Sequence, residues 1–443
     1  MYTIPMPTDK PVRFVASPGG KLSGQLRVPG DKSISHRSIM LGSLAEGETR
    51  ISGFLEGEDS LATLAAFREM GVGIEGPDQG RVRIQGVGLR GLTRPQGALY
   101  LGNSGTSMRL MSGLLAGQSF DTTLTGDASL SGRPMLRVVA PLISMGARID
   151  TRAGGTAPLV IHAASGLTGI DYTMPIASAQ VKSCILLAGL YASGSSCVTE
   201  PAPTRDHTER MLAGMGYPVE RQAGRVCIEG GHALAGIDID IPADISSAAF
   251  FVVAASIAPG SELLLEHVGM NPTRTGIIDI LQRMGADIEV SNARDVGGEP
   301  VAELRVRSAP LHGIDIPAEL VPLAIDEFPV IFIAAACAQG RTVLTGAEEL
   351  RVKESDRIQV MADGLQTLGI RAEATADGMI IEGGTLGGGR VDSHGDHRIA
   401  MAFSVAALRA SGEIEIGNCA NVNTSFPGFV AQACAAGLSI DVR

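Results

Sequence analysis

The sequence predicts an α/β protein of two domains, in which one strand–helix–strand–helix–strand–strand unit is used six times. Three observations support this fold class. At 443 residues the chain exceeds what one ordinary hydrophobic core needs, so two domains are expected. Helix patterns that end in glycine recur along the whole chain. Several helix patterns are apolar on every side, which is typical of helices buried inside a domain.

The repeated unit is clearest where its helices end. Each glycine suits the left-handed position that follows a helix, and successive glycines lie 68 to 84 residues apart, at Gly71, Gly146, Gly216, Gly285, Gly369 and Gly437. Five copies then show a second strand pattern, at residues 81–84, 159–161, 225–228, 304–307 and 379–382. The sequence therefore predicts one supersecondary unit in six copies.

The sixth copy ends at residues 440–442 and lacks its last strand. Residues 12–15 alternate between polar and apolar and can supply that strand, so we assign residues 1–21 to the C-terminal domain together with residues 237–443. The N-terminal domain is then residues 22–236. This assignment predicts that the chain crosses between the domains near Leu22 and near Gly236.

Residues 245–258 and 331–338 read as helices that are apolar all round, which predicts helices inside each domain and sheets outside. The polar first turns of such helices must then emerge together at one end of the domain. These first turns contain Lys32, Gly105, Gln180, Asp326 and Arg398.

Composition excludes several classes of protein. No apolar run reaches the about 20 residues of a membrane span, and residues 1–10 lack the apolar core of a signal peptide. The net charge of −11 argues against nucleic acid as a partner. The six cysteines show no C-x-x-C spacing, which predicts buried thiols in a reducing cytoplasm rather than a disulfide or zinc site. Low aromatic content favours a monomer.

The first helix start, residues 28–37, is the strongest candidate for an anion site. Asp31 and Ser33 are good capping residues, and Lys32 and Arg37 add two cations to a helix end that already attracts anions. A capped helix with solvated charges would explain the same residues.

Further polar segments of the N-terminal domain also precede helices. Residues 103–109 contain a glycine through which an anion can approach backbone N–H groups, and Arg133 suits bidentate binding of a carboxylate or phosphate. Residues 178–183 offer amide and hydroxyl donors, and residues 204–210 contain five ionisable groups. The structural alternatives are a glycine turn, a solvated arginine, ordinary capping and a salt-bridged surface helix.

In the C-terminal domain, Asp326 lies at the mouth of a very apolar helix, where half-burial could raise its pKa and make it a general base. Simple N-capping is the alternative. Residues 351–357 place Lys353, Glu354 and Arg357 on one helix face, unless they are only a solvated face. The H-x-x-H spacing at residues 394–397 is weak evidence for a metal, and no metal site is expected.

Taken together, these segments resemble the 5-enolpyruvylshikimate-3-phosphate (EPSP) synthase family. The matching segments follow the family's order over nearly the whole chain, at residues 29–37, 102–106, 132–135, 178–180, 351–357 and 396–398. The resemblance implies an inside-out α/β barrel fold of two domains with three units each and an active site in the cleft between them. It also implies transfer of the enolpyruvyl group of phosphoenolpyruvate to the 5-hydroxyl of shikimate 3-phosphate, through a tetrahedral intermediate and without a cofactor.

The resemblance also implies residue roles. Asp326 would take the proton of the 5-hydroxyl, and Glu354 with Lys32 would protonate the methylene carbon. Shikimate 3-phosphate would be held by Lys32, Ser33, Arg37, Ser178, Ala179, Gln180, Arg205, Asp326 and Lys353. Phosphoenolpyruvate would be held by Lys32, Gly105, Arg133, Gln180, Arg357 and Arg398.

Two departures from the family pattern stand out. Thr424 occupies a position where many relatives carry a phosphate-binding lysine, and Ala179 with Arg205 resembles a divergent, largely bacterial branch. Some members of that branch tolerate glyphosate, a property tied to alanine at the position of Gly105. Glycine at this position predicts sensitivity.

Two rival functions remain. UDP-N-acetylglucosamine enolpyruvyl transferase shares the fold and the chemistry, but it carries a cysteine in the loop that corresponds to residues 127–133, where this chain has none. The other rival is a catalytically silent protein that binds a phosphorylated metabolite. The presence of Asp326, Glu354 and Lys32 together argues against it.

Overall fold

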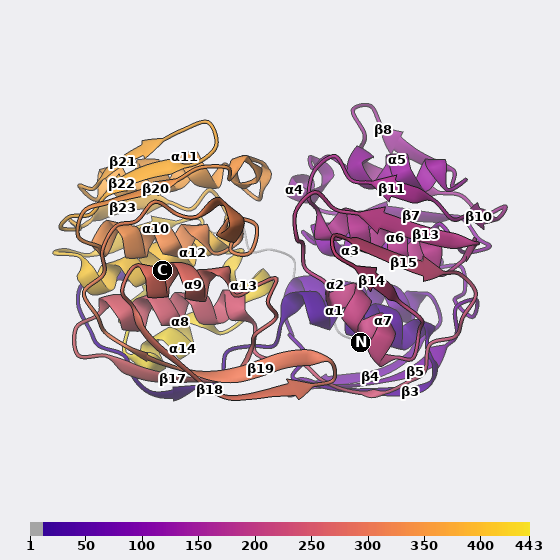
Figure 1. The fold of residues 1–443 in the computed structure, drawn as a ribbon, viewed down its shortest axis with the longest axis horizontal. Helices are drawn as coiled ribbons and strands as arrows, with labels where there is room; N and C mark the ends of the chain where they lie inside the picture. Colours follow the sequence, from indigo (N-terminus) through magenta and orange to yellow (C-terminus); the bar gives the residue numbers. More distant parts are fainter. Residues whose placement is uncertain (1–11) are drawn as a thin grey trace.

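The computed structural model describes residues 12–443, which form two halves of similar construction lying side by side (Figure 1). The predicted absence of a signal peptide concerns residues 1–10, which lie outside the described residues. No helix in the described part of the chain is long and apolar enough to cross a membrane.

Each half contains three pairs of helices, and the first helix of each pair is the more buried one. In α8, all 13 residues are buried, as its all-round apolar sequence predicts. The first members of the pairs are α1 (Lys32–Leu44), α3 (Gly105–Leu115), α6 (Ala179–Gly189), α8 (Ile245–Ile257), α10 (Phe328–Cys337) and α12 (His397–Ala406). The second members are α2 (Glu58–Glu69), α5 (Leu136–Ser144), α7 (His207–Gly214), α9 (Gly276–Arg283), α11 (Arg357–Thr367) and α14 (Phe429–Ala436). Short helices are α4 (Ala128–Ser131), α13 (Val422–Ser425), η1 (Ala318–Leu320), η2 (Glu348–Val352) and η3 (Ala407–Arg409).

Sheets lie outside the helices of the N-terminal half, as predicted (Figure 1). Their strands, in sheet order, are β16 (Asp238–Asp240), β3 (Glu46–Ser52), β5 (Arg81–Val87) and β4 (Gly73–Asp78); β6 (Leu99–Tyr100), β7 (Thr122–Thr125), β9 (Thr156–Ile161) and β8 (Ile149–Arg152); and β11 (Asp171–Thr173), β13 (Ser195–Thr199), β15 (Arg225–Glu229) and β14 (Glu220–Gln222). A small pair joins β10 (Leu167–Thr168) and β12 (Ala192–Ser193).

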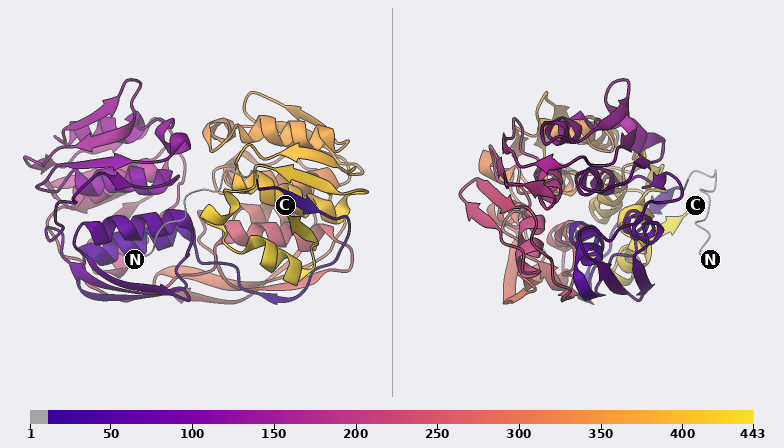
Figure 2. Two further views of the ribbon diagram at one scale, coloured as in Figure 1. Left: turned by 180° about the vertical axis from the view of Figure 1, so that it is seen from behind. Right: turned by 90° about the vertical axis from the view of Figure 1, so that its right-hand side faces the viewer.

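The C-terminal half is enclosed in the same way, as the view from behind also shows (Figure 2). Its strands, in sheet order, are β18 (Asp287–Val296), β19 (Glu299–Arg307), β17 (Glu262–Gly269) and β2 (Ser23–Leu26); β20 (Arg341–Leu344), β22 (Met379–Glu382) and β21 (Arg371–Ala374); and β23 (Gly389–Asp392), β24 (Ile414–Gly417), β1 (Phe14–Ala16) and β25 (Ile440–Val442).

The repeat predicted from glycine-ended helices is confirmed. All six predicted glycines have a positive φ, between 82° and 124°, where a side chain would be strained. The five predicted second strands coincide with β5, β9, β15, β19 and β22. The fifth copy is the least regular, because its first strand is reduced to isolated bridges such as Asp315 with Val343.

The first strands of the two halves are exchanged, which the sequence did not reveal. β2 pairs in parallel with β17 of the C-terminal half, and β16 pairs in parallel with β3 of the N-terminal half. Two separate hydrophobic cores follow the same division, with Val28 in one and Ile34 in the other. Ile241 and Ala243 are likewise divided between the two cores. The chain therefore passes between the halves after the exchanged strands, and not before them near Leu22 and Gly236 as predicted.

Strand β1 completes the sixth copy from the opposite end of the chain. It lies between β24 and β25, with Phe14 opposite Ile416 on one side and Val442 on the other. Phe14 and Ala16 are buried in the C-terminal core.

Deletion of residues 1–20 is therefore expected to unfold the C-terminal half, because it removes an interior strand and leaves two strand edges unpaired. Limited proteolysis and circular dichroism would measure this, with deletion of residues 1–11, which leaves β1 intact, as the control. A truncated chain that melts at the temperature of the full chain would contradict the expectation.

The expectation that all cysteines are free thiols is wrong for one pair. Cys197 and Cys227 form a disulfide across neighbouring antiparallel strands, where they are direct register partners of β13 and β15. The two cysteines are 30 positions apart in the sequence and are brought together by strand pairing, so no local spacing motif predicts this disulfide. Cys184, Cys337, Cys419 and Cys434 are free, and Cys434 is exposed rather than buried.

Candidate active site

The start of α1 places Lys32 where the two halves meet. Asp31 caps the helix by accepting a hydrogen bond from Ile34 N at 2.8 Å, which makes Lys32 the first helical residue. The Lys32 ammonium forms an ion pair with Asp59 of α2 and donates to Ser425 Oγ of α13 at 2.8 Å. Lys32 thus touches both halves of the molecule.

The starts of α3 and α6 form a second group in the N-terminal half. Arg109 of α3 donates to the Gln180 side-chain oxygen, and Gln180 Nε2 donates to Thr106 Oγ1 at 3.2 Å. Arg133 is held by Asn103 Oδ1 at 2.6 Å. Gly105 is the first residue of α3, and a Cβ at this position would lie 3.2 Å from Arg133 Nη1 and 3.3 Å from Arg109 Nη1.

Other predicted residues of this half have mainly local contacts. Ser178 caps α6 by accepting from Val181 N at 3.4 Å, and Ala179 is the first residue of that helix. Ser33 is half-buried in the first turn of α1. Arg37 is buried and donates to Thr208 Oγ1 at 2.7 Å and Ser183 Oγ at 2.9 Å, so its guanidinium is directed into the N-terminal half.

Asp326 lies just before α10 and collects cations from several elements. Lys353 Nζ and Arg357 Nη1 each lie 3.4 Å from its Oδ1, and Arg205 pairs with Oδ2. Arg398 Nη1 donates to the Asp326 main-chain oxygen at 2.9 Å. Because Arg205 belongs to the N-terminal half, this cluster is assembled across the two halves.

The expectation of a raised pKa for Asp326 is wrong. Burial on its own would raise the pKa of this carboxyl. The four surrounding cations outweigh burial and hold the pKa well below its usual range. Sequence showed the burial, but it did not show how many cations would converge on one carboxylate.

Arg357 links three carboxylates and is itself almost fully buried. Its Nε lies 2.8 Å from Asp396, its Nη2 2.6 Å from Glu354 and its Nη1 3.4 Å from Asp326. Burial alone would raise the pKa of Glu354, but Arg357 and more distant cations hold it well below its usual range. Glu354 is therefore ionised near neutral pH. Burial lowers the pKa of the neighbouring His397 to about 3, so this ring is neutral.

Three residues in these contacts were given no role from the sequence, although Asp396 lies in a segment that matches the family. Asp59 pairs with Lys32, Ser425 accepts from Lys32, and Asp396 pairs with Arg357. Asp59 and Asp396 lie at helix starts, where aspartate is common for capping alone, so local sequence cannot distinguish their roles. Thr424, the position of the missing family lysine, is buried and donates to Asn421 O at 2.7 Å.

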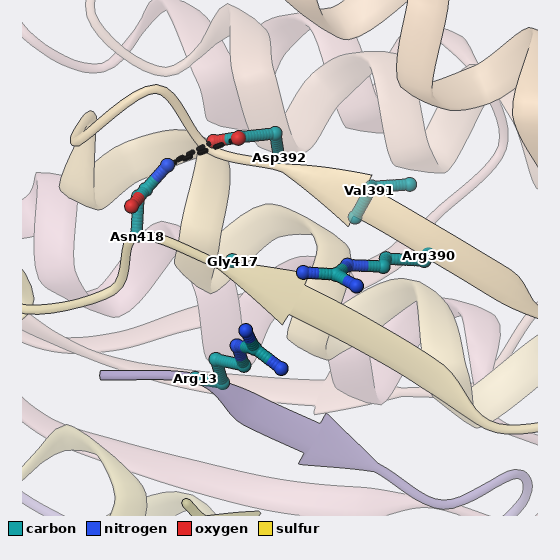
Figure 3. A pocket seen from close by; sticks show the side chains of 6 residues that line it. All are labelled: Arg13, Arg390, Val391, Asp392, Gly417 and Asn418. Carbon is teal, nitrogen blue, oxygen red and sulfur yellow. Dashed lines mark hydrogen bonds between the residues drawn. The ribbon is translucent and has the colours of Figure 1, made fainter. Parts of the chain in front are cut away.

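A separate hollow of about 320 Å³ lies beside strands β23, β24 and β1 (Figure 3). Its arginines, Arg13 and Arg390, both pair with Glu415, and Asp392 accepts from Asn418. This hollow offers two partly exposed arginines that share one carboxylate, whereas four cations from both halves converge at Asp326. The cluster around Asp326 is therefore the better candidate for binding anions. Among residues 12–443, no group of three or more His, Cys, Asp and Glu side chains is arranged to hold a metal ion.

Comparison with known proteins gives one consistent result. A family model described as EPSP synthase (3-phosphoshikimate 1-carboxyvinyltransferase) matches residues 16–432. The 3-phosphoshikimate 1-carboxyvinyltransferase of Alkalilimnicola ehrlichii is 72% identical over 430 residues, which cover 97% of this chain and 96% of that protein. The one of Methylococcus capsulatus is 70% identical over 434 residues, covering 98% and 99%. A solved structure of EPSP synthase from Acinetobacter baumannii has a TM-score of 0.89 at 57% identity and covers 98% of this chain and 100% of that one. This chain belongs to the EPSP synthase family.

Proposed function

We propose that Asp326, Glu354 and Lys32 carry the chemistry of the family's reaction, in which the enolpyruvyl group of phosphoenolpyruvate is transferred to the 5-hydroxyl of shikimate 3-phosphate and phosphate is released. The observation that carries the proposal is the Asp326 carboxylate, which four cations from both halves surround. Both substrates are multiply anionic, so cations that now neutralise protein carboxylates can turn to substrate phosphates and carboxylates.

In this proposal, substrate binding also raises the pKa of Asp326, the general base. Arg357 and Arg398 turn to phosphoenolpyruvate, and Lys353 and Arg205 turn to shikimate 3-phosphate together with Ser33, Arg37, Ser178, Ala179 and Gln180. Asp326 then loses part of the positive charge that depresses its pKa, so its affinity for the 5-hydroxyl proton rises. Gly105, Arg133 and Gln180 complete the phosphoenolpyruvate site.

The test is release of inorganic phosphate from phosphoenolpyruvate by the full chain. We expect release only when shikimate 3-phosphate is also present, and we expect no release with UDP-N-acetylglucosamine in its place. Release with the sugar nucleotide, or none with either acceptor, would overturn the proposal. We further propose that the chain acts as a cytoplasmic monomer, which size-exclusion chromatography with light scattering would test for the oligomeric state.

Glu354 supplies a prediction about protons. Since its pKa is held well below the usual range, Glu354 must take up a proton before it can protonate the methylene carbon. We expect proton uptake when shikimate 3-phosphate and the unreactive inhibitor glyphosate bind near neutral pH, as Arg357 turns from Glu354 to the ligand. Calorimetry in buffers of different ionisation enthalpy measures this, and uptake that persists unchanged in Glu354→Gln would contradict it.

Gly105 supplies a prediction about glyphosate. A Cβ at this position would lie 3.2 Å from Arg133 Nη1 and 3.3 Å from Arg109 Nη1, so it would push on the guanidinium that is proposed to bind phosphoenolpyruvate. We expect the wild-type chain to be sensitive and Gly105→Ala to need at least about tenfold more glyphosate, the typical effect of one methyl group in a binding pocket. Inhibition curves measure this, with Gly97→Ala as the control because nothing lies near its Cβ. A wild type inhibited only at millimolar glyphosate would contradict the expectation.

A further inference from the structure

The two segments that cross between the halves are hydrogen-bonded to each other. Gly30 and Ala243 form an antiparallel bridge, with reciprocal bonds on either side: Asp31 N donates to Pro242 O at 2.8 Å, and Asp244 N donates to Pro29 O at 2.9 Å. A Cβ on Gly30 would lie 1.8 Å from Gly53 O and 3.2 Å from Ile241 Cγ2 of the other crossing segment, so the packing around the bridge has room only for glycine. The crossing is a packed joint rather than a loose linker.

Arg274, which precedes α9, binds both sides of this joint. Its Nη1 lies 2.8 Å from Asp31 Oδ2, and its Nη2 lies 3.0 Å from Asp244 Oδ1. These carboxylates are equivalent: Asp31 caps α1, the first helix of one half, and Asp244 caps α8, the first helix of the other. All three side chains are buried. One guanidinium therefore fixes the two helix starts relative to each other.

The same arginine reaches a third helix start. Arg274 Nη1 lies 3.5 Å from Nε2 of His207, the first residue of α7, and Nδ1 of that ring lies 2.8 Å from Glu299 of β19. Asp206 and Glu299 are further joined through Asn271, at 2.7 and 3.1 Å. The beginning of α7, in the N-terminal half, is thus anchored to the C-terminal half.

Of these three helix starts, those of α1 and α7 carry residues of the proposed site. Lys32 directly follows Asp31, and its backbone N–H donates to Asp244 Oδ2 at 3.2 Å. Arg205 lies two residues before His207 and pairs with Asp326. We propose that Arg274 is a positioning residue, which sets Lys32 and Arg205 against Asp326 through the joint between the halves. This inference rests on the proposed function.

The test compares Arg274→Lys with the double variant Arg274→Met/Asp31→Asn. Lysine keeps the charge but cannot bind two carboxylates with a planar fork. The double variant removes the Arg274–Asp31 charge pair together and keeps a good cap at position 31. Only Asp244 then loses a cation, and it keeps its hydrogen bonds from Lys32 N and Ser246 N. We expect both variants to fold and kcat/KM to fall about 10- to 100-fold, as for other remote changes that misplace reacting groups. We expect kcat to fall along with the rise in KM.

Tyr217→Phe is the control, because it removes a partly buried hydrogen bond of 2.7 Å to Glu229 O within the third unit and leaves the joint intact. It should lower the melting temperature without changing kcat or KM. Folded Arg274 variants with wild-type kcat/KM would overturn the inference, and so would failure of both variants to fold, which would assign Arg274 to stability alone. A wild type without activity would instead overturn the proposed function.

Discussion

Asp326→Asn is expected to lower kcat by about 10²- to 10⁴-fold, the range that a general base contributes. The amide keeps the size of the side chain but cannot accept the proton of the 5-hydroxyl. It also removes the negative charge that the four surrounding cations share. We therefore expect these cations to bind the anionic substrates at least as well as in the wild type.

Phosphate release under saturating substrates measures kcat, and calorimetric titration with shikimate 3-phosphate measures binding. Asp363→Asn on the exposed side of α11 is the matched control and should leave both quantities unchanged. If Asp326→Asn kept more than about a tenth of the wild-type kcat, Asp326 would not be the base.

Arg357→Met is expected to abolish activity and to destabilise the fold by about 3–5 kcal/mol, because removing one partner of a buried ion pair leaves the other charge uncompensated. Asp396, which is fully buried, would lose its 2.8 Å contact with Arg357 Nε, and Glu354 would lose its partner. Denaturant unfolding and phosphate release measure the two effects.

The control for this change is Arg371→Met on β21, which loses only a surface pair with Glu382 and should change neither quantity. The matched pair separates the loss of a buried cation from the loss of an arginine as such. An Arg357→Met chain as stable as the wild type would show that Asp396 needs no compensating charge.

The sequence predicted local structure well because local structure follows from local causes. The glycine after each helix is required by its positive φ, and the apolar runs of α8 and α10 can only be buried, so the units and their inside-out arrangement follow. A strand at residues 12–15 was predicted because the sixth copy was visibly one strand short, and the structure places this strand at Phe14–Ala16.

What the sequence did not reveal is pairing between distant segments. The pattern of β2 shows that it is a strand but not which sheet it joins, and the spacing of Cys197 and Cys227 does not show that they face each other. In the site, the polar helix starts were identified, but the four cations that depress the pKa of Asp326 come from three separate segments. The ion pairs of Arg274 with Asp31 and Asp244 could not be predicted from the sequence either, because each aspartate has the pattern of an ordinary helix cap.

The exchange of β2 and β16 bears on how such a molecule could arise. Each three-unit half donates its first strand to the other and receives the equivalent strand in return. Two copies of a half-length chain that traded this strand would interlock as a swapped homodimer, with the same reciprocal contacts at its twofold axis. Gene duplication and fusion of such a dimer would preserve the interlock in one polypeptide. After fusion the two formerly identical halves could also diverge in sequence, so that one came to carry Lys32 and the other Asp326.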